Sequence, residues 1–203
     1  MHKSIMLLIF AFTLAMTACS EVQIEEVGEE TSLERGFCSA VSEIPTSECE
    51  ALVSFYNSTN GPNWALKRGW LETKHPCDWS GVECGAGHVR AIMMNYNELS
   101  DSLPPEIGHL SRLATLTLYF NHLRGPIPAE LGHLSNLRVL ILHNNQLSGN
   151  IPAELGNLTN LRMFDANSNN LRGNLPDNIQ NLPGSGYGFL KWGKDQPSAK
   201  DSE

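Results

Sequence analysis

LSRLATLTLYFNHLRGPIPAELGH, residues 110–133, decides the fold, because it returns when the sequence is shifted by 24 residues in either direction. The matching positions include an apolar column and a proline column: Leu116 with Ile92, Leu140 and Phe164, and Pro128 with Pro104, Pro152 and Pro176. A period kept by apolar and special positions together indicates stacked copies of one supersecondary unit. Four copies fit between residues 89 and 182.

Each copy opens with L-x-x-L-x-L, an alternation that predicts a short strand with one buried side. In the second copy Leu116 and Leu118 should point inward. Thr117 and Tyr119 should point outward, because strand side chains alternate between the two faces. One side of the strands is therefore expected to form the core and the other to meet solvent.

Two further columns concern the turns. Glycine gives the chain conformational freedom after the strand in three copies, at Gly125, Gly149 and Gly173. Asp101 takes that place in the first copy, so we expect a distorted turn there. Inward-turned amides can pair backbone groups where each strand ends, which predicts a structural ladder of four asparagines: Asn97, Asn121, Asn145 and Asn169.

The L-x-x-L-x-L opening and the G-x-I-P-x-x-L-G ending resemble the plant-type 24-residue subclass of leucine-rich repeat proteins. The segments ALVSFYNSTNGPNW (residues 51–64) and CDWSGVEC (residues 77–84) resemble the N-terminal cap of that subclass, as found in exported bacterial members. The resemblance implies an α/β repeat fold, a short right-handed solenoid with a parallel, concave β-sheet. Four repeats would occupy residues 89–182, after a helical, disulfide-closed cap over residues 37–88.

Apart from Cys19, the chain has four cysteines, all before the repeats. An even number is typical of disulfides in an oxidising compartment. Four cysteines allow three pairings; the resemblance to the cap implies Cys77–Cys84, and we expect Cys38–Cys49 beside it. A zinc site is the alternative, although the spacing lacks paired C-x-x-C knuckles.

The cap should contain a helix capped at its N-terminus by Thr46 or Ser47, with Glu50 in capping-box spacing to Ser47. Residues 60–62, Asn-Gly-Pro, should end it. Three tryptophans are expected to cover the open end of the first repeat, with ligand stacking as the alternative: Trp64, Trp70 and Trp79.

The N-terminus predicts export. Residues 1–18 have a lysine before a short apolar run and are interpreted as a signal peptide. Residues 16–19, Met-Thr-Ala-Cys, resemble a bacterial lipoprotein cleavage site, which implies a lipidated Cys19 as the membrane anchor. Ser20 next to it resembles the outer-membrane sorting pattern, so the protein would face the periplasm or the cell surface. An ordinary signal peptide, with Cys19 left as a spare thiol, is the alternative.

Two flanking segments are expected to remain outside the repeats. Residues 19–36 hold six glutamates and few large apolar side chains, a composition typical of a flexible, acidic tether. In residues 183–203 the 24-residue phase is lost. There Tyr187, Phe189 and Trp192 are predicted to form a short strand that shields the last repeat, followed by a disordered tail.

Composition and motifs exclude several functions. A net charge of −8 argues against nucleic acid, whose phosphates require a basic surface. No P-loop, dinucleotide fingerprint or nucleophile elbow occurs, so we expect neither an enzyme nor a cofactor. His109 and His133 share one repeat position, but no carboxylate joins them, and no metal site is predicted.

The outward strand positions are the most informative for function. They combine apolar, aromatic and amide side chains, and exposed patches of this kind usually mark contact surfaces. We therefore predict a non-catalytic module that binds a protein or peptide through the concave face, with carbohydrate binding as the alternative. The predicted binding residues are Met93, Asn95, Tyr96, Thr117, Tyr119, Phe120, Ile141, His143, Asn144, Asp165 and Asn167.

Overall fold

The computed structural model describes residues 36–180 of the chain. The predicted signal peptide, the lipidated Cys19 and the acidic tether up to residue 35 lie outside the described residues. The predicted C-terminal shield and tail lie outside them as well. None of the helices within residues 36–180 has the length and apolar composition needed to cross a membrane.

The N-terminal cap is built on helix α2, Thr46–Ser58. Pro45 precedes the helix, and its carbonyl accepts the backbone N–H groups of Glu48 and Cys49 at 3.0 and 3.1 Å. No side chain caps the helix, so the capping box predicted at Ser47 is wrong. The helix begins two residues earlier than that box requires, which leaves Ser47 inside its first turn.

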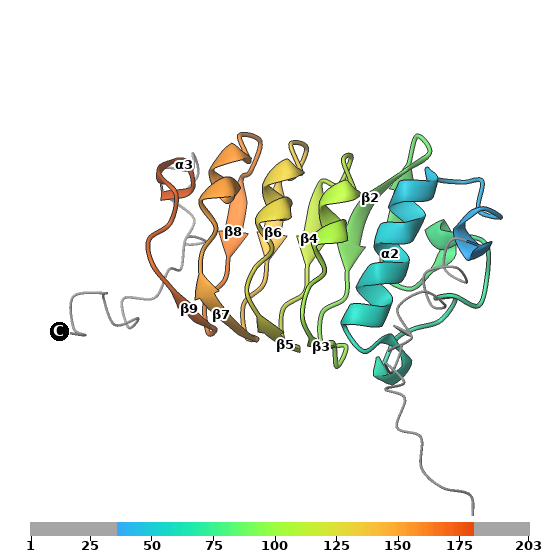
Figure 1. The fold of residues 1–203 in the computed structure, drawn as a ribbon, viewed down its shortest axis with the longest axis horizontal. Coiled ribbons are helices and arrows are strands. Elements are labelled where there is room, and N and C mark those ends of the chain that lie inside the picture. Colours follow the sequence, from blue (N-terminus) through green and yellow to red (C-terminus); the bar gives the residue numbers. More distant parts are fainter. Residues whose placement is uncertain (1–35, 181–203) are drawn as a thin grey trace, which may run out of the picture.

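Two sheets run along the repeats (Figure 1). In the first sheet, four strands are parallel and each pairs with the residues 24 positions further on: β2 (His88–Met93), β4 (Thr115–Thr117), β6 (Val139–Ile141) and β8 (Met163–Asp165). β1 (Val82–Gly85) comes from the cap and pairs with β2 in the antiparallel direction. The second sheet is parallel and was not predicted: β3 (Ser100–Asp101), β5 (His122–Gly125), β7 (Gln146–Asn150) and β9 (Asn170–Arg172).

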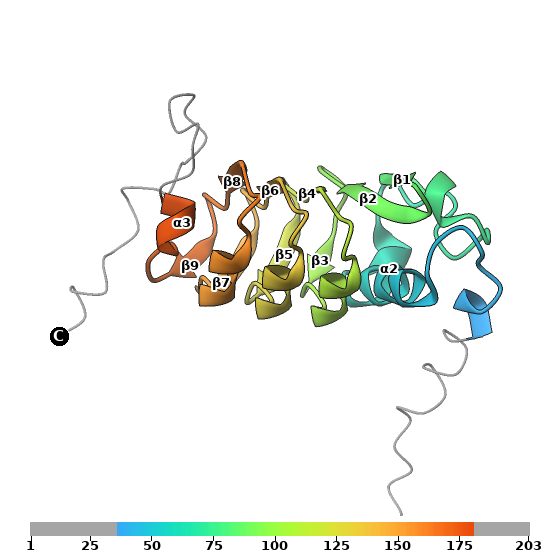
Figure 2. The same cartoon turned by 90° about the horizontal axis from the view of Figure 1, so that it is seen from above.

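Short helices complete the turns of the solenoid. Figures 1 and 2 show them along the side opposite the first sheet. In the repeats they are η3 (Pro105–His109), η4 (Ala129–His133), η5 (Ala153–Asn157) and α3 (Asp177–Gln180), and in the cap η1 (Gly61–Asn63) and η2 (Pro76–Asp78).

The core follows the predicted alternation, since Leu116 and Leu118 are fully buried between the sheet and the helices. Asp101, in contrast, does not distort its turn. Its φ of 64° lies in the same left-handed region as the φ of 76° at Gly125. Aspartate tolerates that region better than most residues, and the Arg124 side chain lies 3.9 Å from its carboxylate.

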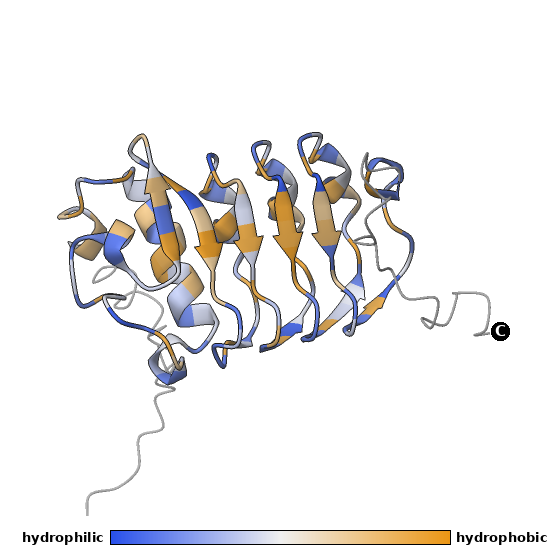
Figure 3. Cartoon of the chain, turned by 180° about the vertical axis from the view of Figure 1, so that it is seen from behind, coloured by the Kyte–Doolittle hydropathy of each residue, from blue (hydrophilic) through white to orange (hydrophobic). Residues whose placement is uncertain are grey.

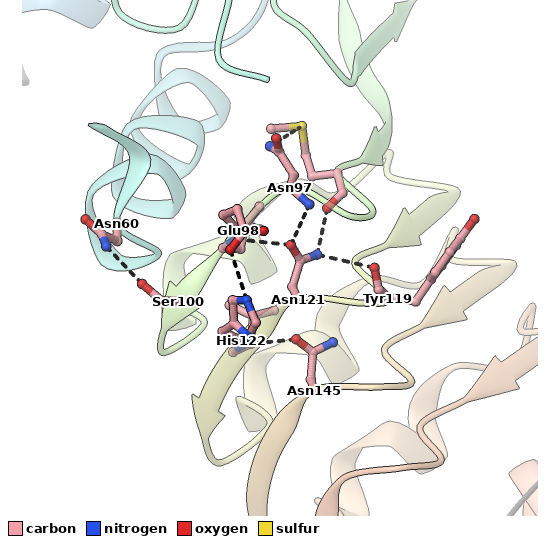
Figure 4. Close-up of polar contacts among 11 residues, drawn as sticks. Asn60, Asn97, Glu98, Ser100, Tyr119, Asn121, His122 and Asn145 are labelled. Atoms are coloured by element: carbon pink, nitrogen blue, oxygen red, sulfur yellow. Dashed lines mark hydrogen bonds and ion pairs between the residues drawn. The ribbon is translucent and has the colours of Figure 1, made fainter. Parts of the chain in front are cut away.

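The asparagine ladder lies inside the solenoid (Figure 4). The Asn121 amide nitrogen donates to the carbonyls of Met94 and Leu118 at 2.8 and 2.9 Å. Its oxygen accepts the backbone N–H groups of Asn97 and Leu99 at 2.9 and 3.1 Å. One side chain thus pairs four backbone groups and joins two successive repeats.

The other ladder amides repeat this arrangement. The Asn145 amide donates to the carbonyls of Leu118 and Leu142. In the next repeat, the Asn169 amide donates to the Leu142 carbonyl. In the first repeat Asn97 bonds the backbone of Leu66 instead, at the junction with the cap. The cap therefore supplies Asn97 with the backbone hydrogen-bond partners that a preceding repeat supplies to the other asparagines of the ladder.

Aromatic packing and disulfides close the cap. Trp64, Trp70 and Trp79 are buried, and the Trp70 ring lies 4.9 Å from each of the other two. Their burial excludes the alternative of ligand stacking. Disulfides join Cys38 to Cys49 and Cys77 to Cys84, which excludes the alternative of a zinc site.

One buried carboxylate ties the cap helix to the first repeat. Glu48 is 2% exposed. Its two oxygens bond His88 Nδ1 at 2.7 Å and the backbone N–H of Val89 at 2.8 Å. The cap is therefore joined to strand β2 by polar contacts as well as by apolar packing.

Candidate binding face

The strands of the first sheet are rich in apolar residues, as their colouring in Figure 3 shows, and some of the apolar side chains on the concave face are exposed. Within residues 36–180 four large apolar side chains are exposed, and three of them lie on this face: Met93 at 39%, Tyr96 at 63% and Phe120 at 43%. The fourth, Leu66, belongs to the cap, and its backbone bonds Asn97 next to Tyr96. The exposed apolar surface therefore lies in the N-terminal half of the solenoid.

Four rings form what we call the ring cluster: Tyr96, Tyr119, Phe120 and His143. Tyr96 and Phe120 are stacked, with ring centroids 4.6 Å apart and an angle of 9° between the planes. Tyr119 and His143 are stacked at 4.8 Å and 11°. The two stacks meet edge to face, at 84° between Tyr96 and Tyr119 and at 84° between Phe120 and His143. The rings therefore brace one another across three repeats.

The backbone beneath part of this cluster is strained. Tyr96 and Phe120 have φ angles of 53° and 54°. The same column continues with Asn144 and Ser168, also left-handed at 54° and 53°. Asparagine accepts this region readily, whereas for a bulky side chain it is a genuine outlier. Strain of this kind persists where surrounding structure imposes it and is concentrated at functional sites.

Thr117 does not contribute an exposed side chain as predicted, because it is only 7% exposed. It points outward by alternation, but the longer Met93 and Ile141 flank it in register on the neighbouring strands. Ile141 itself is half-buried. We call these three residues, Met93, Thr117 and Ile141, the floor of the concave face.

The amide side chains on this face are partly engaged. Asn95 Oδ1 accepts the backbone N–H of Tyr119 at 3.2 Å, and Asn144 Nδ2 lies 2.6 Å from His143 Nδ1. Asp165 Oδ1 accepts both the backbone and the side-chain N–H of Asn167, at 3.0 and 2.7 Å. Met93, Thr117, Ile141 and Asp165 lie at the ends of the strands of the first sheet, and the other predicted binding residues follow two or three positions after those ends.

A column of arginines lies beside the floor, at the start of the strands. Arg90, Arg138 and Arg162 are exposed, and Ala114 stands between the first two. The backbone confirms the column, because Arg138 N–H bonds Ala114 and Arg162 N–H bonds Arg138, each at 2.8 Å. We call these three residues the arginine rim.

A second polar group lies in the cap, where the sequence predicted no site. An open hollow of 410 Å³ is lined by Arg68, Gly69, Glu72, Thr73, His75 and Asp78. The Glu43 carboxylate lies 2.8 Å from His75 Nδ1, and this hydrogen bond raises the pKa of His75 above its ordinary value of 6.5. The mixed charges of the lining favour no single ligand.

Six of the seven histidines lie in the described part of the chain. No group of three or more histidine, cysteine or acidic side chains there could hold a metal ion. His109 and His133 are both exposed at the ends of η3 and η4. The His143 ring stacks on Tyr119 and meets Phe120 edge to face, and its Nδ1 lies 2.6 Å from Asn144 Nδ2.

Family comparisons match the fold. The leucine-rich repeat N-terminal domain matches residues 45–85, and the leucine-rich repeat matches residues 112–134, 136–158 and 160–182. Over 72 residues the chain is 38% identical to the LRR receptor-like serine/threonine-protein kinase FEI 2 of Arabidopsis thaliana. That match covers 34% of this chain and 12% of the kinase, so the chain spans about one eighth of that relative.

Solved structures share the fold of this chain. The LRR ectodomain of the receptor kinase SOBIR1 from Arabidopsis thaliana is 30% identical with a TM-score of 0.56, over 65% of this chain and 72% of that one. The crystal structure of PEPR1–AtPEP1 is 28% identical with a TM-score of 0.59, over 68% of this chain and 20% of that one. FEI 2 and SOBIR1 are plant proteins, so they offer no support for the bacterial setting predicted from residues 16–19.

Proposed function

Because this chain belongs to the leucine-rich repeat proteins, we propose that it is a non-catalytic recognition module that binds a protein or peptide on its concave face. The single observation that carries the proposal is the ring cluster. Its exposed members, Tyr96 and Phe120, lie beside one another and are held by Tyr119 and His143. Rigid aromatic side chains of this kind dominate binding energy at protein interfaces.

The stacking favours a protein over the alternative, a glycan. Sugars bind aromatic side chains through an open ring face. Here Tyr96 and Phe120 stack on each other, and so do Tyr119 and His143, so each ring has one face covered by its neighbour. The two stacks also meet edge to face, at Tyr96 with Tyr119 and at Phe120 with His143. Side chains of a protein partner can pack against the ring edges and the tyrosine hydroxyls as well as against the open ring faces.

The likeness to receptor ectodomains supports the same proposal. SOBIR1 is a receptor kinase whose LRR ectodomain shares this fold, and PEPR1 was crystallised with AtPEP1. The two disulfides favour an oxidising compartment, in agreement with export. A lipid anchor at Cys19 and an outer-membrane position belong to the proposal as sequence predictions.

The proposal is tested by capture of partners with the full chain from a native envelope or extracellular extract, with crosslinking and mass spectrometry. The double variant Tyr119→Ala with Phe120→Ala should lose the captured proteins. The matched control changes two exposed residues of the second sheet, Gln146→Ala with Asn170→Ala, and should keep them. Equal capture by both double variants, each with an unchanged melting temperature, would show that the concave face is not the binding surface.

A further inference from the structure

The two disulfides of the cap differ in their access to solvent. Cys38 and Cys49 are both 0% exposed, inside the core. Cys77 and Cys84 are half-buried and pack against the outside of that core. The open hollow of the cap is lined by the residues on either side of Cys77 in the sequence. A thiol must reach a sulfur atom to exchange with it, and exposed disulfides are the labile ones, so access selects the Cys77–Cys84 bond.

The loop between these two cysteines has contacts that do not depend on the bond. Trp79 is buried, and its ring lies 4.9 Å from that of Trp70. The Ser80 N–H donates to the Arg68 carbonyl at 3.0 Å, and the Ser80 carbonyl accepts the indole N–H of Trp70 at 2.8 Å. The two cysteines are only 7 positions apart, and a short closed loop restrains the unfolded chain less than a long one. Reduction should therefore loosen this loop without unfolding the cap.

The same loop holds the end of strand β2. The Met93 N–H donates to the Gly81 carbonyl at 2.7 Å. A Cβ on Gly81 would collide with the Met93 carbonyl and the Met94 side chain, so the loop is in close contact with the strand. Met93 belongs to the floor of the concave face, and the Met94 carbonyl accepts the amide of Asn121 at 2.8 Å, next to Phe120 of the ring cluster. A continuous series of contacts therefore joins the disulfide loop to the concave face.

We propose that Cys77–Cys84 is a reversible thiol-exchange site whose redox state controls the rigidity of the concave face. A thiolate of an external dithiol attacks one of the two sulfurs, the S–S bond breaks, and the other cysteine leaves as a thiolate that takes up a proton. The second thiol of the dithiol then attacks the mixed disulfide and releases the first cysteine. The protein gains two electrons and two protons, and the dithiol is oxidised to its own disulfide. The effect on partner binding rests on the proposed function, whereas the exchange chemistry does not.

Timed alkylation of the full chain tests the exchange site. Free thiols are first blocked with unlabelled iodoacetamide. The native protein is then exposed to dithiothreitol for a series of times, each ended by an excess of isotope-labelled iodoacetamide, and the labelled cysteines are measured by mass spectrometry. Cys77 and Cys84 should be labelled together, about tenfold faster than Cys38 and Cys49, which serve as the internal control. Equal rates for the two pairs, or faster labelling of the buried pair, would overturn the proposal.

Amide hydrogen exchange tests the link to the concave face. In the selectively reduced protein the Met93 amide should exchange about tenfold faster than in the oxidised protein, because the Gly81 carbonyl is no longer held in place. The control is the Leu142 amide, which bonds the Asp165 carbonyl at 2.7 Å and should not change. The double variant Cys77→Ser with Cys84→Ser should show the same difference without any reductant. Equal Met93 exchange in the oxidised protein, the reduced protein and this variant would overturn the link.

Capture of partners separates this inference from the proposed function. The Cys77→Ser with Cys84→Ser variant should capture less of each partner than the wild type. If it captures as much, while Tyr119→Ala with Phe120→Ala abolishes capture, control of binding by the disulfide is overturned and the proposed function stands. If the concave-face variant captures as much as the wild type, the proposed function falls, and the alkylation rates still decide whether Cys77–Cys84 is an exchange site.

Discussion

Replacement of Asn121 by alanine tests the physical account of the fold most directly. The Asn121 amide pairs four backbone groups, at 2.8 to 3.1 Å, belonging to Met94, Leu118, Asn97 and Leu99. It is 5% exposed, so water cannot readily replace these bonds. At about 1 kcal/mol net for each hydrogen bond, the variant should lose about 4 kcal/mol of unfolding free energy. For a domain of this size that corresponds to a fall in melting temperature of about 8–16 °C.

The assay is thermal and urea unfolding followed by circular dichroism. The matched control is Asn160→Ala, which removes the same chemical group from an exposed site with one hydrogen bond to Ser135, 2.8 Å long. The control should lose about 0.5 kcal/mol or less. If Asn121→Ala unfolds at the same temperature as Asn160→Ala, the ladder does not hold the repeats together and the reasoning is refuted.

Three further predictions follow from single contacts. Phe120→Asn should be about 0.5–1 kcal/mol more stable in urea than Phe120→Ala, because asparagine accepts the left-handed backbone; the opposite order would show that the backbone there is unstrained. The raised pKa of His75 means that its bond to Glu43 contributes stability below pH 6.5, lost as pH rises through the raised value. Proton NMR titration should show the His75 pKa falling in Glu43→Gln, and an unchanged value would contradict the pairing. Gly132→Ala should cost about 1–3 kcal/mol in urea unfolding, since its new Cβ would collide with the backbone oxygen of Glu154. In the control Gly156→Ala the new Cβ meets nothing nearer than 3.5 Å, and the change should be nearly neutral.

The 24-residue period of the sequence predicted which residues align on neighbouring strands. Leu116 pairs with Ile92 and Leu140 because stacked copies of one unit must align equivalent residues. The Cys77–Cys84 disulfide followed from the resemblance of residues 77–84 to a known cap rather than from spacing, and Cys38–Cys49 was the pair expected beside it. The second sheet was missed, because a strand such as His122–Gly125 is four residues long and has a single buried residue, Leu123. It pairs only because stacking brings its neighbours alongside.

The candidate site was predictable in outline but not in detail. Alternation placed Tyr119 outward, and the structure agrees with that direction. Burial of Thr117 depends on the length of its neighbours across the sheet, which no single copy reveals. The left-handed backbone at Tyr96 and Phe120 was not foreseen either, since aromatic residues give no signal for it. Asn144 and Ser168, in the same column, did indicate an unusual backbone conformation, because asparagine and serine are common turn residues and asparagine tolerates the left-handed region.

The asparagine ladder and the ring cluster both constrain the backbone at residues 119–121. Phe120 is followed directly by Asn121, and the Phe120 N–H bonds the His143 carbonyl at 3.1 Å. Figure 4 shows the Asn121 amide beneath the strand end that carries Tyr119. The rings are therefore fixed before any partner arrives, and binding to a preorganised surface loses less side-chain entropy. Two aromatic residues in a backbone region that disfavours them cost stability, and a partner that contacts both rings would supply a physical reason for keeping them.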